Sequence, residues 1–150
     1  MRRLRLYIDT SVIGGCLDNE FRIDSEAILD MAKDGRIILV VSNIMLRELE
    51  SAPVEVQARF FSLPPKCVEE IEFDVESIYL RDQYLARGIV GPASSVDAHH
   101  VALAVVSRAD MIVSWNFRHI VHFEKIQGFN SVNIAEGYPQ IAIYSPKEVV

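Results

Sequence analysis

The 150-residue sequence is poor in the features that mark disulfide-stapled and membrane-spanning proteins. Its two cysteines, Cys16 and Cys67, are too few for a disulfide framework and lack the spacing of a metal site. The longest apolar runs, at 37–41 and 101–106, are too short to cross a membrane. The first apolar segment ends at Asp9, which is too early for a signal peptide. We therefore expect a cytoplasmic protein with no membrane association.

Positive charge is also scarce. The 15 Lys and Arg residues are outnumbered by 21 Asp and Glu residues, which gives a formal net charge of −6. This balance argues against a generic binder of polyanions, so a nucleic-acid substrate would need a local site. The chain has no internal repeat, low-complexity segment or linker, and half of its residues are hydrophobic. We expect one globular domain over residues 1–150.

Apolar runs alternate with segments of helical periodicity along the chain. The runs at 4–8, 37–42 and 110–114 are typical of interior strands of a parallel sheet, and 67–73 suits an edge strand or an extended connector. Helical spacing, caps and stops predict helices at 21–34, 43–52, 53–63, 74–87, 94–108 and 118–127. The tail contains short β-like pieces. This order predicts an α/β fold, a three-layer α/β/α sandwich with a central parallel sheet.

Oxygen-bearing side chains stand where two predicted strands end and where one predicted helix begins. Asp9, Thr10 and Ser11 follow the first strand. Asn116 follows the strand at 110–114, and Asp97 falls in the first turn of the helix at 94–108. Ligands of open α/β sheets gather at the carboxyl ends of the strands, so these side chains are site candidates. The segment at 9–11 also fits a helix N-cap, and a cap and a ligand can coexist.

Glu48 lies early in the helix at 43–52, beside its apolar face. Its spacing alone slightly favours a solvated helix acid, paired with Arg47. Clustered carboxylates, however, repel one another unless a cation neutralises them, and hard oxygen ligands suit Mg²⁺ or Mn²⁺. Together with Asp9 and Asp97, Glu48 can form a site that activates water for attack on a phosphodiester.

Four segments resemble, in order and spacing, the PIN-domain nucleases, and in particular the VapC-type toxins of bacterial toxin–antitoxin pairs. They are YIDTSVIGG at 7–15, LRELE at 46–50, VDAHHVALA at 96–104 and DMIVSWNFRHI at 110–120. The similarity extends to the SP-x-EV-like tail at 145–149. It implies a Mg²⁺- or Mn²⁺-dependent endoribonuclease acting on tRNA or another structured RNA, a small antitoxin that blocks the site, and a homodimer. The wider family also has members that act on DNA, so a DNA substrate is an alternative.

The resemblance also implies roles for individual residues. Asp9, Glu48 and Asp97 match the acidic metal-binding positions, and Thr10 or Ser11 matches the accompanying hydroxyl. We also expect Thr10 and Ser11 to contact the substrate. We expect Asp9 and Asp97 to bind the ion directly. Glu48 is expected to bind it through water or to position the attacking water.

Asn116 departs from the family pattern, because many PIN domains have a fourth acid after this strand. We count Asn116 among the catalytic candidates, since its amide oxygen can bind Mg²⁺ or hold a bound water. It brings no charge, however, so a one-metal site is better supported than a two-metal site.

A basic edge on the predicted helix at 118–127 is expected to contact the substrate. Arg118, His119 and Lys125 are candidates for phosphate binding there. His119 and His122 have an i, i+3 spacing that suits a metal, but histidines at the surface or the core edge are the favoured interpretation. Trp115 can stack on a base, although a single Trp that closes an apolar strand is more often part of a core.

Two other function classes fit parts of the sequence. An aspartyl-phosphate enzyme or receiver-type domain also places an Asp at a strand end, as with Asp9. The phosphatase pattern needs a second Asp where Ser11 stands, and a receiver needs a Lys after a late strand. The other alternative is a catalytically silent PIN-like binding module that keeps the acids only as helix caps. Metal-dependent RNA cleavage distinguishes the nuclease from the silent module, and trapping of an acyl phosphate distinguishes it from the phosphotransfer enzyme.

Overall fold

The computed structural model describes residues 2–150, in which five strands form one sheet. The strands are β1 (Leu4–Ile8), β2 (Ile37–Ser42), β3 (Val68–Ile71), β4 (Met111–Val113) and β5 (Ala142–Tyr144). They lie in the order β3-β2-β1-β4-β5, and every neighbouring pair is parallel. The three predicted interior strands are confirmed, and the segment at 67–73 supplies an edge strand.

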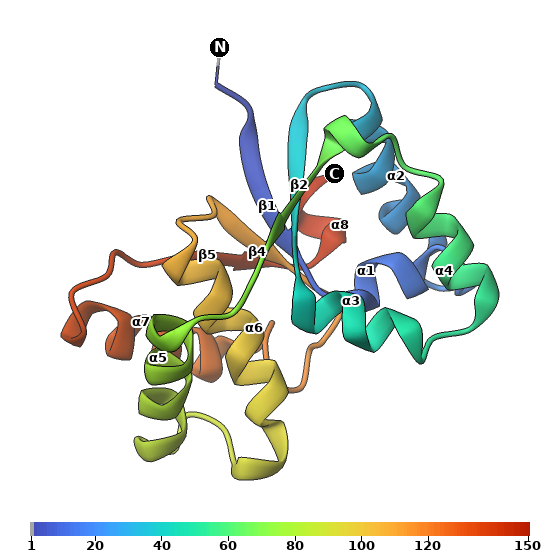
Figure 1. Cartoon of the computed structure of the whole chain (residues 1–150). Helices are drawn as coiled ribbons and strands as arrows, with labels where there is room; N and C mark the ends of the chain where they lie inside the picture. The colour runs from blue at the N-terminus through green and yellow to red at the C-terminus, as the bar shows by residue number, and fades with distance from the viewer. Residues whose placement is uncertain (1) are drawn as a thin grey trace.

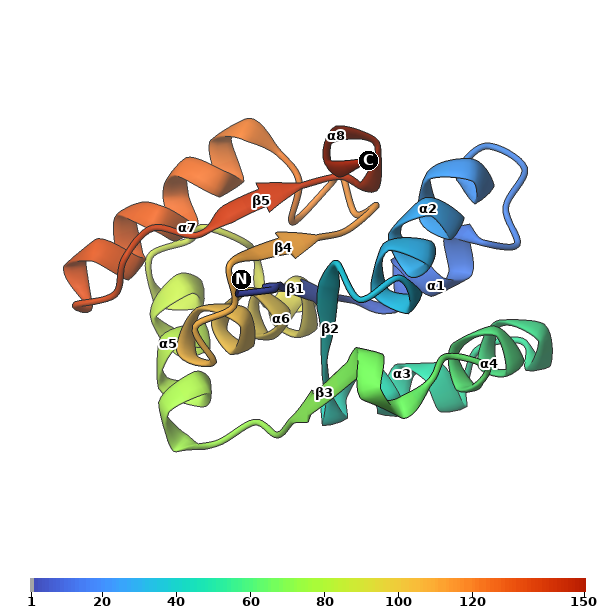
Figure 2. The same cartoon turned by 90° about the horizontal axis from the view of Figure 1, so that it is seen from above.

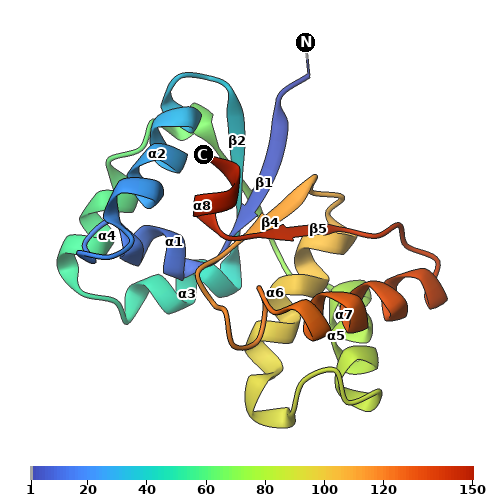
Figure 3. The ribbon, with the colours of Figure 1, turned by 180° about the vertical axis from the view of Figure 1, so that it is seen from behind.

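Helices cover both faces of this sheet (Figures 1 and 2). One face carries α1 (Thr10–Gly15), α2 (Arg22–Lys33), α3 (Asn43–Glu50), α4 (Val54–Phe61) and α8 (Pro146–Val149). The other face carries α5 (Val75–Ala86), α6 (Ser95–Val106) and α7 (Phe123–Ala135). Figure 3 shows α8 next to α2, which it contacts. The predicted α/β/α sandwich is confirmed, and no helix within residues 2–150 is long and apolar enough to cross a membrane.

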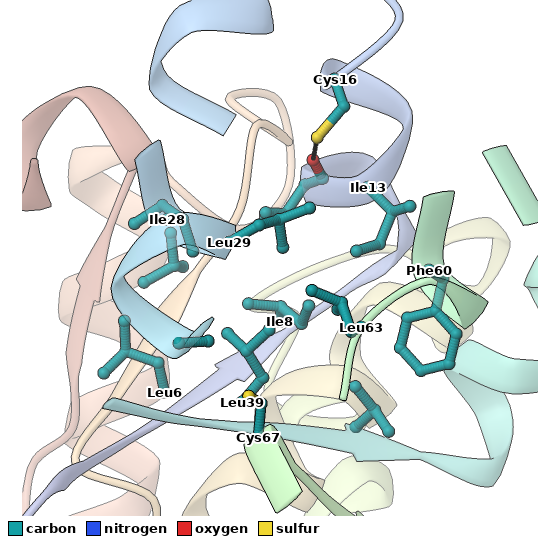
Figure 4. Packing of buried hydrophobic residues seen from close by; sticks show 14 of the residues in the cluster. Leu6, Ile8, Ile13, Cys16, Ile28, Leu29, Leu39, Phe60, Leu63 and Cys67 are labelled. Carbon is teal, nitrogen blue, oxygen red and sulfur yellow. Dashed lines mark hydrogen bonds between the residues drawn. The ribbon is translucent and has the colours of Figure 1, made fainter. Parts of the chain in front are cut away.

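Alternate residues of β1 pack into two hydrophobic cores, one on each face of the sheet. Leu6 and Ile8 join Ile28 and Leu29 of α2 in the core that Figure 4 shows. Tyr7, between them in sequence, packs into the core under α5, α6 and α7. Because both faces of the sheet are covered, its central strands are apolar on both sides, which explains their continuous hydrophobic runs.

The helix predicted at 118–127 is wrong at both ends. Residues 117–120 form a turn, whereas α7 begins at Phe123 and continues to Ala135. Gly128 lies inside α7, although glycine in the middle of a helix is destabilising. In the structure, a Cβ at Gly128 would lie 2.9 Å from Ile89 Cδ1. The glycine therefore permits close packing of α7 on the loop after α5, and this tertiary contact outweighs its low helix propensity.

The strand order places a topological switch point between β1 and β4. From β1 the chain continues to β2 and β3 on one side of the sheet, whereas β4 and β5 are added on the other. Asp9 follows β1 and Ser114 follows β4, so both stand at the carboxyl edge, where α/β sheets bind their ligands. Asp110 precedes β4 at the opposite edge, where it pairs with Arg2.

Candidate active site

Asp9 occupies the N-cap position of α1, but its buried carboxylate makes no capping hydrogen bond. Instead, Ser11 Oγ donates to Oδ1 at 2.5 Å and Ser114 Oγ donates to Oδ2 at 2.7 Å. These two hydroxyls in turn accept the backbone N–H groups of Trp115 and Asn116, each at 2.9 Å. The hydroxyl protons are thereby directed at the carboxylate. The two serines thus tie β1 to the segment after β4 through Asp9.

Glu48 reaches the same edge from α3. Its Oε1 accepts a hydrogen bond from Thr10 Oγ1 at 3.1 Å and lies 2.7 Å from Nε2 of His100, a buried residue of α6. Nδ1 of His100 is 2.7 Å from the Tyr7 hydroxyl, which is 2.8 Å from Ser42 Oγ. Although 40% of the Glu48 side chain is exposed, its hydrogen-bond partners are Thr10 and His100 rather than Arg47, so it is the outer end of a hydrogen-bond chain that continues into the core.

Asp97 lies in the first turn of α6, as expected, and is joined to the segment after β4. Asn116 Nδ2 donates to Asp97 Oδ1 at 3.1 Å, and Asn116 Oδ1 accepts the backbone N–H of His119 at 2.9 Å. The amide oxygen that was expected to face a metal or a water is thus engaged by the backbone. Asn116 contacts the acidic cluster through its nitrogen and orients Asp97.

Burial and mutual charge shift the pKa values of this cluster in opposite directions. Burial raises the pKa of Asp9, and the charge of His100 and the two serine hydroxyls offset only part of this rise. Burial also acts to raise the pKa of Glu48, but the hydrogen bond and charge of His100 lower it on balance. For His100, burial acts to lower the pKa, whereas Glu48, Asp9 and Asp97 together raise it. The pKa of His100 is therefore raised by the charges of all three acids.

The donor chemistry of the cluster fits a hydrated Mg²⁺ or Mn²⁺. Within residues 2–150, no three His, Cys, Asp or Glu side chains stand close enough to enclose a metal ion by themselves. Mg²⁺ does not need such an enclosure, because it keeps several waters and binds through one or two carboxylates and substrate phosphates. Asp9, Glu48 and Asp97 are the residues that would hold it, each already oriented by a hydrogen bond from a neighbour.

The expected basic edge is only partly available for substrate. Arg118 is exposed and His119 is partly buried, close to Asn116 in sequence and space. Lys125, in contrast, donates a hydrogen bond from Nζ to the carbonyl oxygen of Ile89 at 3.1 Å, so its ammonium group is held against the loop after α5. His122 is the N-cap residue of α7, and the helical face that was to present it with His119 does not exist.

A hollow with two arginines in its lining lies beside Glu48 and was not predicted. It has a volume of about 300 Å³ and separates α3 from the amino-terminal parts of α5 and α6. The hollow is lined by two arginines, by apolar side chains, by His99 and by Glu48 of the acidic cluster. The lining residues are Ile44, Arg47, Glu48, Phe73, Ile78, Arg81, Val96 and His99. Trp115, the predicted stacking candidate, is instead a core residue, stacked on Phe21 and donating Nε1 to Ser25 Oγ.

Thr10 and Ser11 were expected to contact substrate, but both hydroxyls bind carboxylates of the cluster. The sequence did not identify Ser114, Tyr7 or His100 as parts of the site. The only signal for His100 was its i, i+3 spacing from Asp97, which places both on one face of α6.

Comparison with known proteins bears on the fold and the family of the chain. A chain in the crystal structure of VapBC2 from Rickettsia felis, bound to a DNA fragment from their promoter, superposes with a TM-score of 0.59. The match covers 95% of this chain and 98% of that chain, at 13% sequence identity, and thus shows a shared fold. No curated protein matches the sequence. The family model of the PIN domain matches residues 5–118, which include every acid of the cluster. The chain belongs to the PIN-domain family.

Proposed function

We propose that this protein is a metal-dependent endoribonuclease that hydrolyses RNA phosphodiesters with Mg²⁺ or Mn²⁺. The observation that carries the proposal is the convergence of Asp9, Glu48 and Asp97 from three separate elements on one sheet edge of a PIN-family chain. Oriented carboxylates at this edge suit a divalent cation better than a helix cap, since Asp9 performs no capping. The same observation counts against a silent module that keeps its acids only as caps.

The residues of the chain have separable tasks in this reaction. Bound Mg²⁺ or Mn²⁺ would supply the positive charge that draws in a phosphate and lowers the pKa of a bound water. Asp9 and Asp97 hold that charge in place, and the hydroxyls of Ser11 and Ser114 keep Asp9 in one rotamer. Glu48 orients the attacking water, since part of its side chain is exposed to solvent.

We further propose that the protein is the toxin of a type II toxin–antitoxin pair. The fold shared with a chain of VapBC2 supports this reading, as do the sequence segments at 7–15, 46–50, 96–104 and 110–120. A small antitoxin that covers the acidic edge, a homodimeric toxin and action in the cytoplasm belong to the same proposal. PIN-family membership favours it over a receiver-type domain, which would be phosphorylated at Asp9.

The direct test is RNA cleavage with purified protein, with and without divalent metal. We expect a structured RNA such as tRNA to be cut in Mg²⁺ or Mn²⁺ and left intact in EDTA, with activity restored by added metal. Single-stranded DNA of matched length serves as the control substrate. Cleavage at an equal rate in EDTA would contradict the proposed chemistry, and metal binding without cleavage would favour the silent module.

Charge reversal of Arg118 and Arg47 is expected to weaken RNA binding and to flatten its salt dependence. Each phosphate contact that is lost should reduce the slope of log K against log[salt] by about one unit. Filter binding at several salt concentrations measures this slope. Lys33→Glu is the matched control, because Lys33 ends α2, which runs back toward the opposite edge of the sheet. An equal change in slope for Lys33→Glu would mean that net charge alone governs binding.

Asn116→Asp is expected to tighten Mn²⁺ binding while lowering the stability of the metal-free protein. The new carboxylate would replace the amide that donates to Asp97, so two acids would face each other without metal. Adding charge near the ion should improve binding by about 1–2 kcal/mol after this repulsion is subtracted. Asn116→Ala should weaken binding. Calorimetric titration of Mn²⁺ decides the matter, and three superimposable titrations would place Asn116 outside the metal site.

A further inference from the structure

The buried imidazole of His100 has hydrogen-bond partners on both ring nitrogens, and both partners connect it to the candidate site. Nε2 faces Glu48 Oε1 and Nδ1 faces the Tyr7 hydroxyl, each at 2.7 Å. His100 is 1% exposed, so its side chain is shielded from solvent. A polar group that is this deeply buried is costly unless every hydrogen bond is made, and here both are made.

The direction of the bond to Glu48 follows from the chemistry of the partners. An ionised carboxylate accepts hydrogen bonds only, so Nε2 must carry the proton. Thr10 also donates to Oε1, so two donors converge on one oxygen of Glu48. Within residues 2–150, Oε2 receives no hydrogen bond. The carboxylate is therefore held by one oxygen, and the other is left for a metal-bound water or a substrate.

The inner end of the chain is anchored to backbone. Ser42 Oγ, next to the Tyr7 hydroxyl, accepts the N–H of Met45 at 3.2 Å and caps α3, the helix that carries Glu48. A loop of contacts thus runs from Ser42 at the start of α3 through Tyr7 and His100 back to Glu48, nearly two turns further along α3. Such a loop fixes the rotamer of Glu48 relative to the axis of its own helix.

We infer that His100 is a positioning residue that fixes Glu48 through its Nε2–H and so prepares the acidic cluster for a divalent ion. This inference rests on the proposed function for its catalytic consequence, but the hydrogen bond itself is a property of the metal-free protein. Partners of metal-binding carboxylates and imidazoles typically change metal affinity or activity by about 10–100-fold when they are removed.

The first test concerns the hydrogen bond and needs no metal or activity. In protein with ¹⁵N-labelled histidine, held in EDTA, the Nε2 resonance of His100 should be that of a protonated nitrogen with a downfield proton. Loss of the signal in His100→Phe gives the assignment. Glu48→Gln should shift the Nε2 resonance, whereas Tyr7→Phe should mainly shift Nδ1. An unprotonated Nε2 in the wild type would overturn the inference.

The second test separates positioning from packing. His100→Phe keeps the ring volume and removes the donor, whereas the side-chain nitrogen of His100→Gln stands the same number of bonds from Cα as Nε2. We expect Mn²⁺ affinity by calorimetry, or kcat, to fall by about 10–100-fold in His100→Phe and to be largely restored in His100→Gln. In a Glu48→Ala background, His100→Phe should cause no further loss.

A similar loss in both backgrounds, with no rescue by glutamine, would show that His100 serves packing and would overturn the inference. Thermal unfolding of each variant in EDTA reports whether the fold persists. If the wild type neither binds Mn²⁺ nor cleaves RNA, the proposed function fails, and the ring-nitrogen spectrum still decides whether His100 holds Glu48.

Discussion

Asp9→Asn is expected to lower RNA cleavage by about 10³-fold or more, while raising the unfolding temperature of the metal-free protein. The loss follows because a carboxylate that holds a catalytic cation contributes several kcal/mol to the transition state, and each 1.36 kcal/mol is a factor of about ten. The unfolding temperature rises because burial disfavours the ionised form of Asp9, which raises the pKa of this carboxyl, and asparagine carries no charge. Asparagine keeps an acceptor for one serine and adds a donor that the other serine can accept.

The sign of the stability effect gives a pH signature. The pKa of Asp9 is raised in the folded protein, so the folded state carries no penalty at low pH, where the carboxyl is protonated in both states. The penalty grows as pH rises through the ordinary pKa of an unfolded Asp toward the raised folded value. The advantage of Asp9→Asn should therefore be larger at pH 8 than at pH 4, by about 2–4 °C for each kcal/mol.

Calorimetric unfolding in EDTA at both pH values, with a parallel cleavage assay, measures the two effects. Asp110→Asn is the matched control, because that carboxylate lies at the opposite edge of the sheet and pairs with Arg2. Burial acts to raise the pKa of Asp110, but the hydrogen bonds from the Arg5 backbone and from Arg2 lower it on balance. Asp110→Asn should thus reduce stability and spare cleavage. Equal stability of Asp9→Asn and wild type at pH 8 would mean that the ionised Asp9 carboxylate does not destabilise the metal-free protein.

Gly15→Ala is expected to destabilise the fold by about 1–3 kcal/mol and to disturb the site as well. A Cβ at Gly15 would lie 2.3 Å from Ser25 Oγ and 2.7 Å from Trp115 Nε1, two atoms that are hydrogen-bonded to each other. Displacing Trp115 shifts the backbone N–H that fixes Ser11, and with it the orientation of Asp9. We therefore expect a lower unfolding temperature together with slower cleavage.

Gly14→Ala provides the control within the same helix. No atom lies within 4 Å of a Cβ at Gly14, so alanine should be neutral or should add about 0.5–1 kcal/mol of stability. Thermal unfolding and cleavage rates of the two variants form one comparison. If both substitutions were tolerated equally, the close approach of α1 to Trp115 would not constrain the site.

The main features of the fold were predictable because they depend on residue type and period. The runs at 4–8 and 37–42 are apolar without alternation, which is characteristic of strands covered on both faces, and the structure buries them in this way. Strand ends then located Asp9 at the carboxyl edge. The prediction of a helix at 118–127 was wrong because α7 extends through Gly128, which packs against Ile89. This contact joins segments that are distant in sequence, so no local pattern encodes it.

The partners of the acids were harder to predict, and the adjacent histidines show why. His99 and His100 differ by one position on α6, which turns their side chains about 100° apart. His99 is hydrogen-bonded to Ser77 at the start of α5, and burial lowers the pKa of His99 to about 4. This histidine therefore joins α6 to α5. His100 meets Glu48 instead. Choosing between them requires the positions of α3 and α5, which only the assembled structure provides.

The order of the strands also determines when, during synthesis, the acidic site of the proposed toxin becomes complete. Asp9 belongs to the first strand to leave the ribosome, but the hydroxyl of Ser114 that orients it comes 105 residues later. At about 5–20 residues per second, that interval lasts roughly 5–20 seconds. Throughout it, β1 lacks its neighbour β4 and the acidic edge is incomplete. Under the proposed function, the nascent chain would therefore be inactive until most of it has been translated, and an antitoxin made earlier would have time to bind it as it folds.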